Sequence, residues 1–242
     1  GDLSVLKCGW QKFVGQSLRL SAPHGLTRPV VMDTTVEQID GYRFIYCLPF
    51  SDSEIFVEDT YYADTAELDS KTSHARIAAY AEDHGWQIET VLSEEKGQLP
   101  VIYGGDFEAF WKANRSVDAR AGARAALIQP ITSYSLPMAV KTAILIAEMP
   151  DISQAKLDKM LRNLAQNHWK NGKFYRMLCA FLFLGADPDK RYKTLEHTYS
   201  KDEKLLARFY AGKSTLLDQA NLLTGKPPIP VSRAIPLLLK YK

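Results

Sequence analysis

One stretch of this chain decides its fold: residues 41–62, which read GYRFIYCLPFSDSEIFVEDTYY. Two runs rich in β-branched and aromatic residues, 42–50 and 55–62, flank a short polar turn, and this pattern predicts a β-hairpin. The second run carries the adjacent acids Glu58 and Asp59. A carboxylate on an apolar strand face is unfavourable unless it is paired, protonated or used chemically. The hairpin is therefore also the first place to look for a functional acid.

The register of the hairpin decides which acid faces which side of the sheet. A four-residue turn would place Tyr46 opposite Asp59. Asp59 would then lie among aromatic side chains, and Glu58 would share the other face with Arg43. A slip of one residue changes which strand faces are shared, so the assignment stays open. In either register one acid lies on each face.

The hairpin and other segments carry short motifs. They are 20–26 (LSAPHGL), 32–33 (MD), 41–44 (GYRF), 48–49 (LP), 56–60 (FVEDT), 134–137 (YSLP), 208–213 (RFYAGK) and 224–228 (TGKPP). Together they resemble the bacterial branch of the flavin-dependent lycopene β-cyclases of carotenoid biosynthesis. The acidic motif of that family, Phe-Leu-Glu-Glu-Thr in plants, corresponds to FVEDT. The resemblance covers nearly the whole chain.

The resemblance implies an isomerase that cyclises the ends of lycopene to β-ionone rings, giving β-carotene by way of γ-carotene. The reaction is redox-neutral and acid-initiated, with reduced FAD as cofactor and NAD(P)H as reductant. It also implies carotenoid ligands and a cytoplasmic enzyme with peripheral or monotopic association with a membrane surface. A redox flavoenzyme of the same fold, such as a monooxygenase or isoprenoid reductase, is one alternative. A non-catalytic fragment that binds carotenoid or membrane is another.

Glu58 matches the acidic position of the family and is the principal catalytic candidate. Asp59 and Asp33 are secondary candidates. A carboxyl held neutral in an apolar pocket is the acid that protonation of an alkene requires. The alternative for Glu58 is a strand-edge acid paired with Arg43. Asp33 is either a carboxylate at a strand end or turn, or a second acid in the same cavity as Glu58.

Composition and cysteine usage fit a globular protein with a sizeable core. The 242 residues are 46% hydrophobic, and the formal net charge of +2 gives no indication of a nucleic-acid partner. The three cysteines, Cys8, Cys47 and Cys179, are far apart and form no CxxC pair. We therefore expect reduced thiols in a cytoplasmic setting, and neither a disulfide framework nor a metal site.

The pattern of elements predicts an α+β fold, a truncated flavoprotein of the p-hydroxybenzoate hydroxylase-like type. Residues 1–115 should form an antiparallel substrate-binding sheet with one helix, and 116–150 a second flavin-binding segment and helix. Residues 151–242 should be helical and possess a membrane-facing part. The expected strands of the sheet region are 5–10, 16–20, 30–36, the hairpin 42–62, and a second hairpin of 86–92 and 99–103, whose solvated turn carries Glu94 and Glu95. Its expected helix covers 68–84, ending at Gly85.

A small-residue loop leads to a helix start near residue 138, where backbone N–H groups can meet an anion. In flavoproteins of this type the second flavin motif lies here. The resemblance implies that the cofactor-binding residues are Gly122, Ala123, Arg124, Pro130, Ser133, Tyr134, Ser135 and Leu136. Ser133 stands where close cyclases have glycine, which permits a positive φ. By spacing alone, a plain loop–helix junction is the alternative.

Two phosphate-binding patterns are incomplete. No GxGxxG occurs in the chain, so we expect the pyrophosphate-binding loop to lie upstream of Gly1. We therefore interpret the chain as a fragment. Alone, this fragment should neither hold FAD tightly nor cyclise lycopene. Residues 211–215 (AGKST) resemble the end of a Walker A loop, but the required glycine is replaced by Ala207.

The apolar segment 174–184 is too short to span a bilayer and is flanked by basic residues. It is either a buried core helix or a monotopic segment that enters one leaflet. The hydrocarbon substrate implied by the resemblance favours the monotopic alternative.

Overall fold

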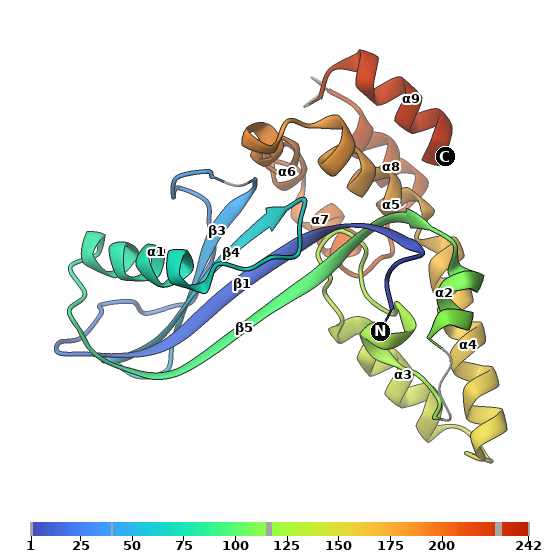
Figure 1. The fold of residues 1–242 in the computed structure, drawn as a ribbon, viewed down its shortest axis with the longest axis horizontal. Helices are drawn as coiled ribbons and strands as arrows, with labels where there is room; N and C mark the ends of the chain where they lie inside the picture. Colours follow the sequence, from blue (N-terminus) through green and yellow to red (C-terminus); the bar gives the residue numbers. More distant parts are fainter. Residues whose placement is uncertain (1, 40, 115–117, 226–228, 242) are drawn as a thin grey trace. The chain divides into compact units, whose positions relative to one another are not determined.

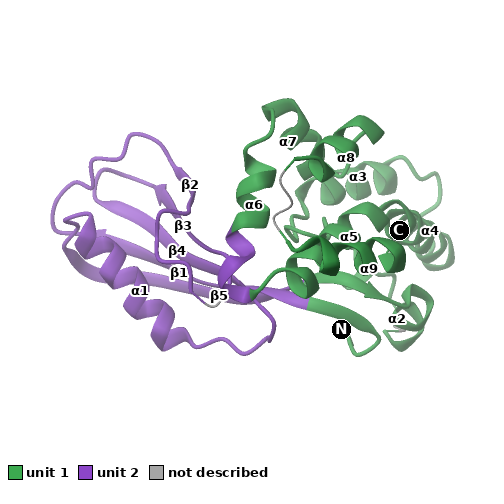
Figure 2. Ribbon diagram, turned by 90° about the horizontal axis from the view of Figure 1, so that it is seen from above, with its two compact units in different colours: residues 1–8, 101–187, 193–242 green, residues 9–100, 188–192 purple. Residues whose placement is uncertain are grey.

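The computed structural model describes residues 2–39, 41–114, 118–225 and 229–241, and these divide into two compact units (Figures 1 and 2). We call residues 9–100 and 188–192 the sheet unit. Residues 1–8, 101–187 and 193–242 are the helical unit. The expected boundary at 115/116 and part of the TGKPP motif lie outside the described residues.

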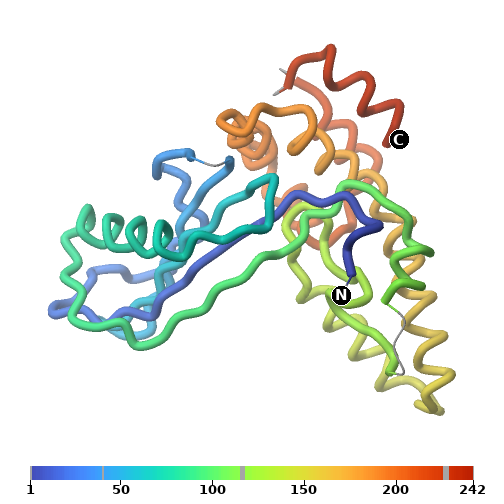
Figure 3. Tube along the Cα trace, viewed as in Figure 1, coloured from blue at the N-terminus to red at the C-terminus, as the bar shows by residue number. Residues whose placement is uncertain are grey.

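A five-stranded sheet with the order β2-β3-β4-β1-β5 runs through the sheet unit, and the path of the chain can be followed in Figure 3. Its strands are β1 (Leu6–Leu20), β2 (Val30–Asp33), β3 (Arg43–Pro49), β4 (Glu54–Ala63) and β5 (Ile88–Gly105). The pairs β2–β3, β3–β4 and β1–β4 are antiparallel. The expectation of an antiparallel sheet in a mixed α and β protein is confirmed.

Three details of the predicted strands are wrong. The first strand is not interrupted at Gly15, because β1 pairs continuously with β4 from Trp10 to Arg19. The second predicted hairpin is one long strand, β5, so Glu94 and Glu95 lie on a strand and not on a turn. The strand expected over 30–36 ends at Asp33. Tertiary pairing overrides the local preference of Gly and Glu for turns here.

The β3–β4 hairpin forms as predicted, but its register is slipped by one residue. Tyr46 pairs with Glu58, and Ile45 pairs with Asp59. The Glu54 carbonyl accepts hydrogen bonds from the backbone N–H groups of Phe50 and Ser51, so Phe50 faces Glu54 and the turn between them is one residue shorter than expected. Since side chains alternate along a strand, this slip exchanges the two acids between faces.

Helix α1 (Ser70–Asp83) lies across one face of the sheet (Figure 2). Its first turn is capped by the Asp69 side chain, and Gly85 follows the helix with a φ of 69°. The apolar core between α1 and the sheet consists of Val14, Leu18, Leu20, Ile45, Cys47, Ile55, Val57, Ile77, Tyr80, Ala81 and Trp86. This core fixes which sheet face is closed by the helix.

The helical unit contains α2 (Phe107–Ala113), a 3-10 turn (Gly122–Ala125), α3 (Leu136–Ala147), α4 (Gln154–Asn171), α5 (Lys173–Ala180), a π-helical turn (Phe181–Gly185), α7 (Glu203–Tyr210), α8 (Leu216–Leu223) and α9 (Val231–Tyr241). A second 3-10 turn (Pro188–Lys190) belongs to the sheet unit, and the division between the units falls within α6 (Arg191–Tyr199). Residues 151–242, which were expected to be helical, contain α4 to α9.

The apolar segment 174–184 forms α5 and the π-helical turn. Most of its side chains are buried within the chain, and Leu184 is its one member that is strongly exposed. Burial of this kind favours the core-helix interpretation of the segment over the monotopic one. Among the residues that the structure describes, no helix combines the length and the apolar character needed to cross a membrane.

Candidate functional site

The sheet face opposite α1 carries Glu58 among aromatic side chains. We call it the Glu58 face; its members are Phe13, Gly15, Tyr42, Phe44, Tyr46, Phe56, Glu58, Thr60 and Tyr62. Its rings form a continuous series: Tyr42 lies 5.8 Å from Tyr62 and 5.2 Å from Phe44, and Phe44 lies 5.3 Å from Tyr46 between ring centroids. The slipped register thus places Glu58, and not Asp59, on the aromatic face.

Gly15 leaves space for an aromatic ring beside Glu58. It pairs with Glu58 across β1 and β4. A Cβ atom at this position would stand 2.2 Å from Cζ of Phe56, so the ring occupies the place that any other side chain would take. A larger residue here would therefore displace the Phe56 ring from its place beside Glu58.

The surroundings of Glu58 favour its neutral form. Burial raises the pKa of the Glu58 carboxyl above its ordinary value, and the negative charges of Glu95 and Asp59 raise it further. The Thr60 hydroxyl donates a 2.6 Å hydrogen bond to Oε1 of Glu58 and acts in the opposite direction. In the described part of the chain Glu58 has no ion-pair partner, so the expected alternative of a pair with Arg43 is wrong.

Glu95 is a residue of this face that the sequence did not reveal. It was expected on a solvated turn, but it lies on β5 and is close enough to Glu58 to raise the pKa of that carboxyl. Its neighbour Glu94 points the other way, since it accepts from Gln16 and pairs with His74 of α1 at 2.6 Å. The only possible signal in the sequence is the alternation of a long strand, which the Glu and Gly residues obscure.

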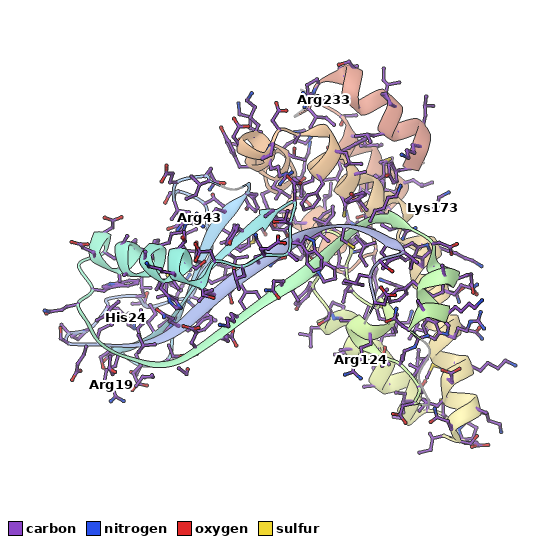
Figure 4. All side chains as sticks on the ribbon, in the orientation of Figure 1. Arg19, His24, Arg43, Arg124, Lys173 and Arg233 are labelled. Atoms are coloured by element: carbon purple, nitrogen blue, oxygen red, sulfur yellow. The ribbon has the colours of Figure 1, made fainter. Side chains whose placement is uncertain are left out.

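Asp59 is buried on the α1 side of the sheet and holds an arginine. Nε of Arg43, which is labelled in Figure 4, donates to Oδ1 of Asp59 at 2.6 Å. Nη1 of Arg76 from α1 lies 3.6 Å from Oδ2. The Asp59 side chain is 0% exposed and that of Arg43 only 6%. Asp59 is therefore an internal counter-ion, facing away from Glu58.

Asp33 does not share a cavity with Glu58, and that expectation is corrected by the structure. Its strand partner is Ile45, a residue of the α1 side. Its carboxylate accepts hydrogen bonds from the backbone and hydroxyl of Thr35 and from the Tyr80 hydroxyl of α1. These bonds lower the pKa of Asp33 although burial opposes them. Asp33 is the strand-end carboxylate of the first interpretation.

The predicted flavin-binding segment forms a compact loop before α3. Oε1 of Gln129 accepts from the backbone N–H groups of Ile131 and Thr132, and the Gln129 carbonyl accepts from Ser133 N–H. Ser133 has a φ of 53°, so this position does adopt the left-handed backbone for which the glycine expected from the resemblance would be suited. Arg124, labelled in Figure 4, is exposed.

The rim of this loop offers partial features of an anion site. No side chain caps the start of α3 at Ser135, so its first backbone N–H groups are available to a ligand. Gly122, with a φ of 58°, has open space where a Cβ would stand. The adjoining cavity, lined in part by Pro130, Tyr134 and Pro137, measures only about 40 Å³. The residues of this loop are suited to contact the edge of a flavin, but the cavity is too small to enclose one.

The AGKST segment connects α7 and α8 and does not form a phosphate loop. The Thr215 side chain caps α8 in a reciprocal arrangement with Asp218. Arg208 forms two hydrogen bonds to the same Asp218 carboxylate. The structural reason for these residues is therefore helix capping, as the missing glycine at position 207 indicated.

Comparisons with known proteins place the chain in a family. The profile of the family described as lycopene cyclase protein matches residues 3–235. A lycopene beta-cyclase of Pantoea ananas is 42% identical over 236 residues, covering 98% of this chain and 61% of the relative. A lycopene beta-cyclase of Pseudescherichia vulneris is 41% identical over 231 residues, covering 96% of this chain and 60% of the relative. The chain spans about three-fifths of the length of these relatives.

Proposed function

This chain belongs to the lycopene cyclase family, and on that premise we propose that it supplies the proton-donating surface of a lycopene β-cyclase, with Glu58 as the acid. The observation that carries the proposal is the placement of Glu58 on an aromatic strand face with a raised pKa and no cationic partner in the described chain. A neutral carboxyl in such surroundings is a stronger proton donor to an alkene than a solvated carboxylate.

The proposed reaction conserves atoms and electrons. The Glu58 carboxyl transfers its proton to a carbon of the terminal alkene of lycopene, which leaves a carbocation and the Glu58 carboxylate. A neighbouring double bond of the substrate attacks the cation and closes the ring. Loss of a different proton from the ring to a base restores a double bond. Phe44 and Tyr46, which adjoin Glu58, stabilise the cation through their ring faces without forming a bond to it.

Reduced FAD belongs to this proposal as cofactor, with NAD(P)H as reductant. When bound, it would supply negative charge close to the cation or serve as a further proton source. The residues of this chain that would hold its edge are the loop rim at Gly122–Arg124, Pro130 and the α3 start at Ser133–Leu136. The left-handed backbone at Ser133 and the uncapped start of α3 support this assignment.

Contact with a membrane follows from a substrate that is a long hydrocarbon. The buried segment 174–184 does not support this part of the proposal. The exposed leucines of the helical unit support it better: Leu216 and Leu217 at the start of α8 are 82% and 83% exposed, and Leu239 of α9 is 78% exposed. Apolar side chains this exposed suit insertion at an interface.

Replacing Glu58 by glutamine in the complete protein tests the proposal. With reduced FAD and lycopene supplied, ring formation should fall by at least about 100-fold, the lower end of the usual contribution of a general acid. The matched control is Glu54→Gln on the same strand, where the acid forms an exposed pair with Arg19 and should be dispensable. Near-normal cyclisation by Glu58→Gln would remove this residue from the mechanism. Stoichiometric NAD(P)H consumption would instead indicate a redox flavoenzyme.

A further inference from the structure

The helical unit contains an apolar cavity to which the proposed proton transfer assigns no role. The cavity measures about 240 Å³ and is lined by five helical segments. Its buried wall includes Leu182, Leu195, Leu222 and Ile229. None of the described lining residues is lysine, arginine, aspartate or glutamate. All of these lining residues belong to the helical unit, whereas the Glu58 face belongs to the sheet unit.

The size of the cavity defines what it can hold. A dry apolar cavity of roughly 150 Å³ is enough to bind benzene, which has six carbons. On that scale the 240 Å³ cavity accommodates roughly ten carbons. Apolar side chains that line such a pocket lack packing partners on one side, so a hydrocarbon that fills it gains dispersion contacts and removes apolar surface from water.

The cavity also has an apolar entrance. Three large apolar residues of its lining are exposed at the surface: Leu223 (45%), Val231 (56%) and Ile235 (52%). Val231 and Ile235 are one helical turn apart on α9, and exposed Leu239 continues the same row. Helices α5 and α9, which contribute facing walls, lie side by side (Figures 1 and 2). A hydrocarbon can therefore pass from an apolar phase into the cavity along α9.

Two local features of the wall are unusual. The π-helical turn Phe181–Gly185 contributes Phe181 and Leu182, and turns of this type are frequent at functional sites. One hydroxyl of the wall, Oγ1 of Thr194 on α6, is buried without a hydrogen-bond partner among the described residues. It offers a single hydrogen bond to an oxygen atom carried by an otherwise apolar ligand.

We propose that this cavity is a binding site for a hydrocarbon segment of roughly ten carbons, either the end of an isoprenoid or part of a lipid acyl chain. The site goes beyond the proposed reaction, since it lies in the other unit and contains no acid. Both ligand sources share the same chemistry, and the choice between them depends on whether the cavity prefers methyl-branched or straight chains.

Two ten-carbon alcohols, geraniol and n-decanol, are suitable probes, because one is a branched isoprenoid and the other a straight chain. Binding is measured by calorimetric titration and by the rise in melting temperature, which bound ligand causes when it binds only the folded state. Neither measurement depends on catalysis or on FAD, so failure of the cyclase proposal leaves this result unaffected. Tighter binding of geraniol assigns the site to isoprenoids, and tighter binding of n-decanol assigns it to acyl chains.

The decisive variant is Ala234→Phe, which adds bulk to the cavity wall on α9, and the matched control is Ser232→Phe on the exposed side of the same helix. Ala234→Phe should weaken binding of the preferred alcohol at least tenfold, whereas Ser232→Phe should leave it within about twofold. If Ala234→Phe does not fold, Ala234→Leu serves with a smaller increase in volume. Absence of binding by both alcohols, or equal binding by the filled and unaltered proteins, would overturn the proposal.

Discussion

Replacing Asp59 by asparagine should destabilise the sheet unit by about 3–5 kcal/mol, the usual cost of removing one partner from a buried ion pair. The Asp59 and Arg43 side chains are 0% and 6% exposed and meet at 2.6 Å. Arg76, 12% exposed, adds a second guanidinium 3.6 Å from the other oxygen of Asp59. An amide would remove the carboxylate charge that the buried Arg43 guanidinium meets at 2.6 Å and that Arg76 faces at 3.6 Å, so we expect a value in the upper part of that range.

The assay is urea unfolding followed by tryptophan fluorescence, to which Trp86, buried in the core beside α1, contributes together with Trp10, Trp111 and Trp169. Glu58→Gln, one residue away on the opposite face, is the control. The folded Glu58 pKa is raised, so its contribution to stability is present below the unfolded pKa and is lost as pH rises through the folded pKa. Removing this acid should therefore leave stability at pH 7 unchanged or higher.

Two results would refute this reasoning. A loss of less than about 1 kcal/mol for Asp59→Asn would show that the ion pair is not held in a buried site. An equal loss for Glu58→Gln would show that the two acids do not differ in their surroundings. In the expected case Asp59→Asn loses activity only as far as it loses folded protein, whereas Glu58→Gln stays folded and loses ring formation.

Three further predictions concern the Glu58 face and the α3 loop. Gly15→Ala should reduce cyclisation at least tenfold with the fold retained by circular dichroism, because its Cβ would stand 2.2 Å from the Phe56 ring; unchanged activity would show that the ring position is unimportant. Thr60→Val removes a hydrogen bond that lowers the Glu58 pKa, so the alkaline limb of the activity profile should move to higher pH. Glu95→Gln removes a charge that raises the Glu58 pKa, so the same limb should move to lower pH. Shifts of the same sign in both variants would contradict the assignment of Glu58 as the acid. Ser133→Gly should raise stability in urea by about 1 kcal/mol, since a non-glycine residue at a φ of 53° is strained, and a decrease would show that the serine hydroxyl matters more.

The elements with strong local signals were predictable from the sequence. Two β-rich runs and a polar turn predicted the hairpin, and the Asp69 cap and the Gly85 stop predicted α1. The continuous β5 was not predictable, because its outer half is exposed and carries Glu, Lys and Gly, which alone favour a turn. That segment becomes a strand because it pairs with β1.

The identity of the candidate acid was predictable from the sequence, but the sheet face on which it lies was not. The motif around Glu58 pointed to the correct strand, yet the face occupied by each acid depended on one residue of turn length. The positions of Glu95 and Asp33 relative to Glu58 were also not predictable from the sequence. The residues of 93–97 suggested a solvated turn for Glu95, and the family resemblance suggested a shared cavity for Asp33. In the structure Glu95 lies on the Glu58 face and Asp33 under α1.

The slipped register has a chemical consequence that exceeds the placement of one acid. It collects the cations Lys12, Arg43 and Arg76 on the α1 side, where Tyr61 and Asp59 contact them. A guanidinium beside Glu58 would lower the pKa of its carboxyl and hold it as a carboxylate that has no proton to give. The same positive charge would also repel a carbocation forming in the substrate. Asp59 therefore serves the Glu58 face indirectly, because by binding Arg43 beneath the sheet it leaves Glu58 with carboxylates and aromatic rings as neighbours, surroundings that favour both the neutral acid and the cation.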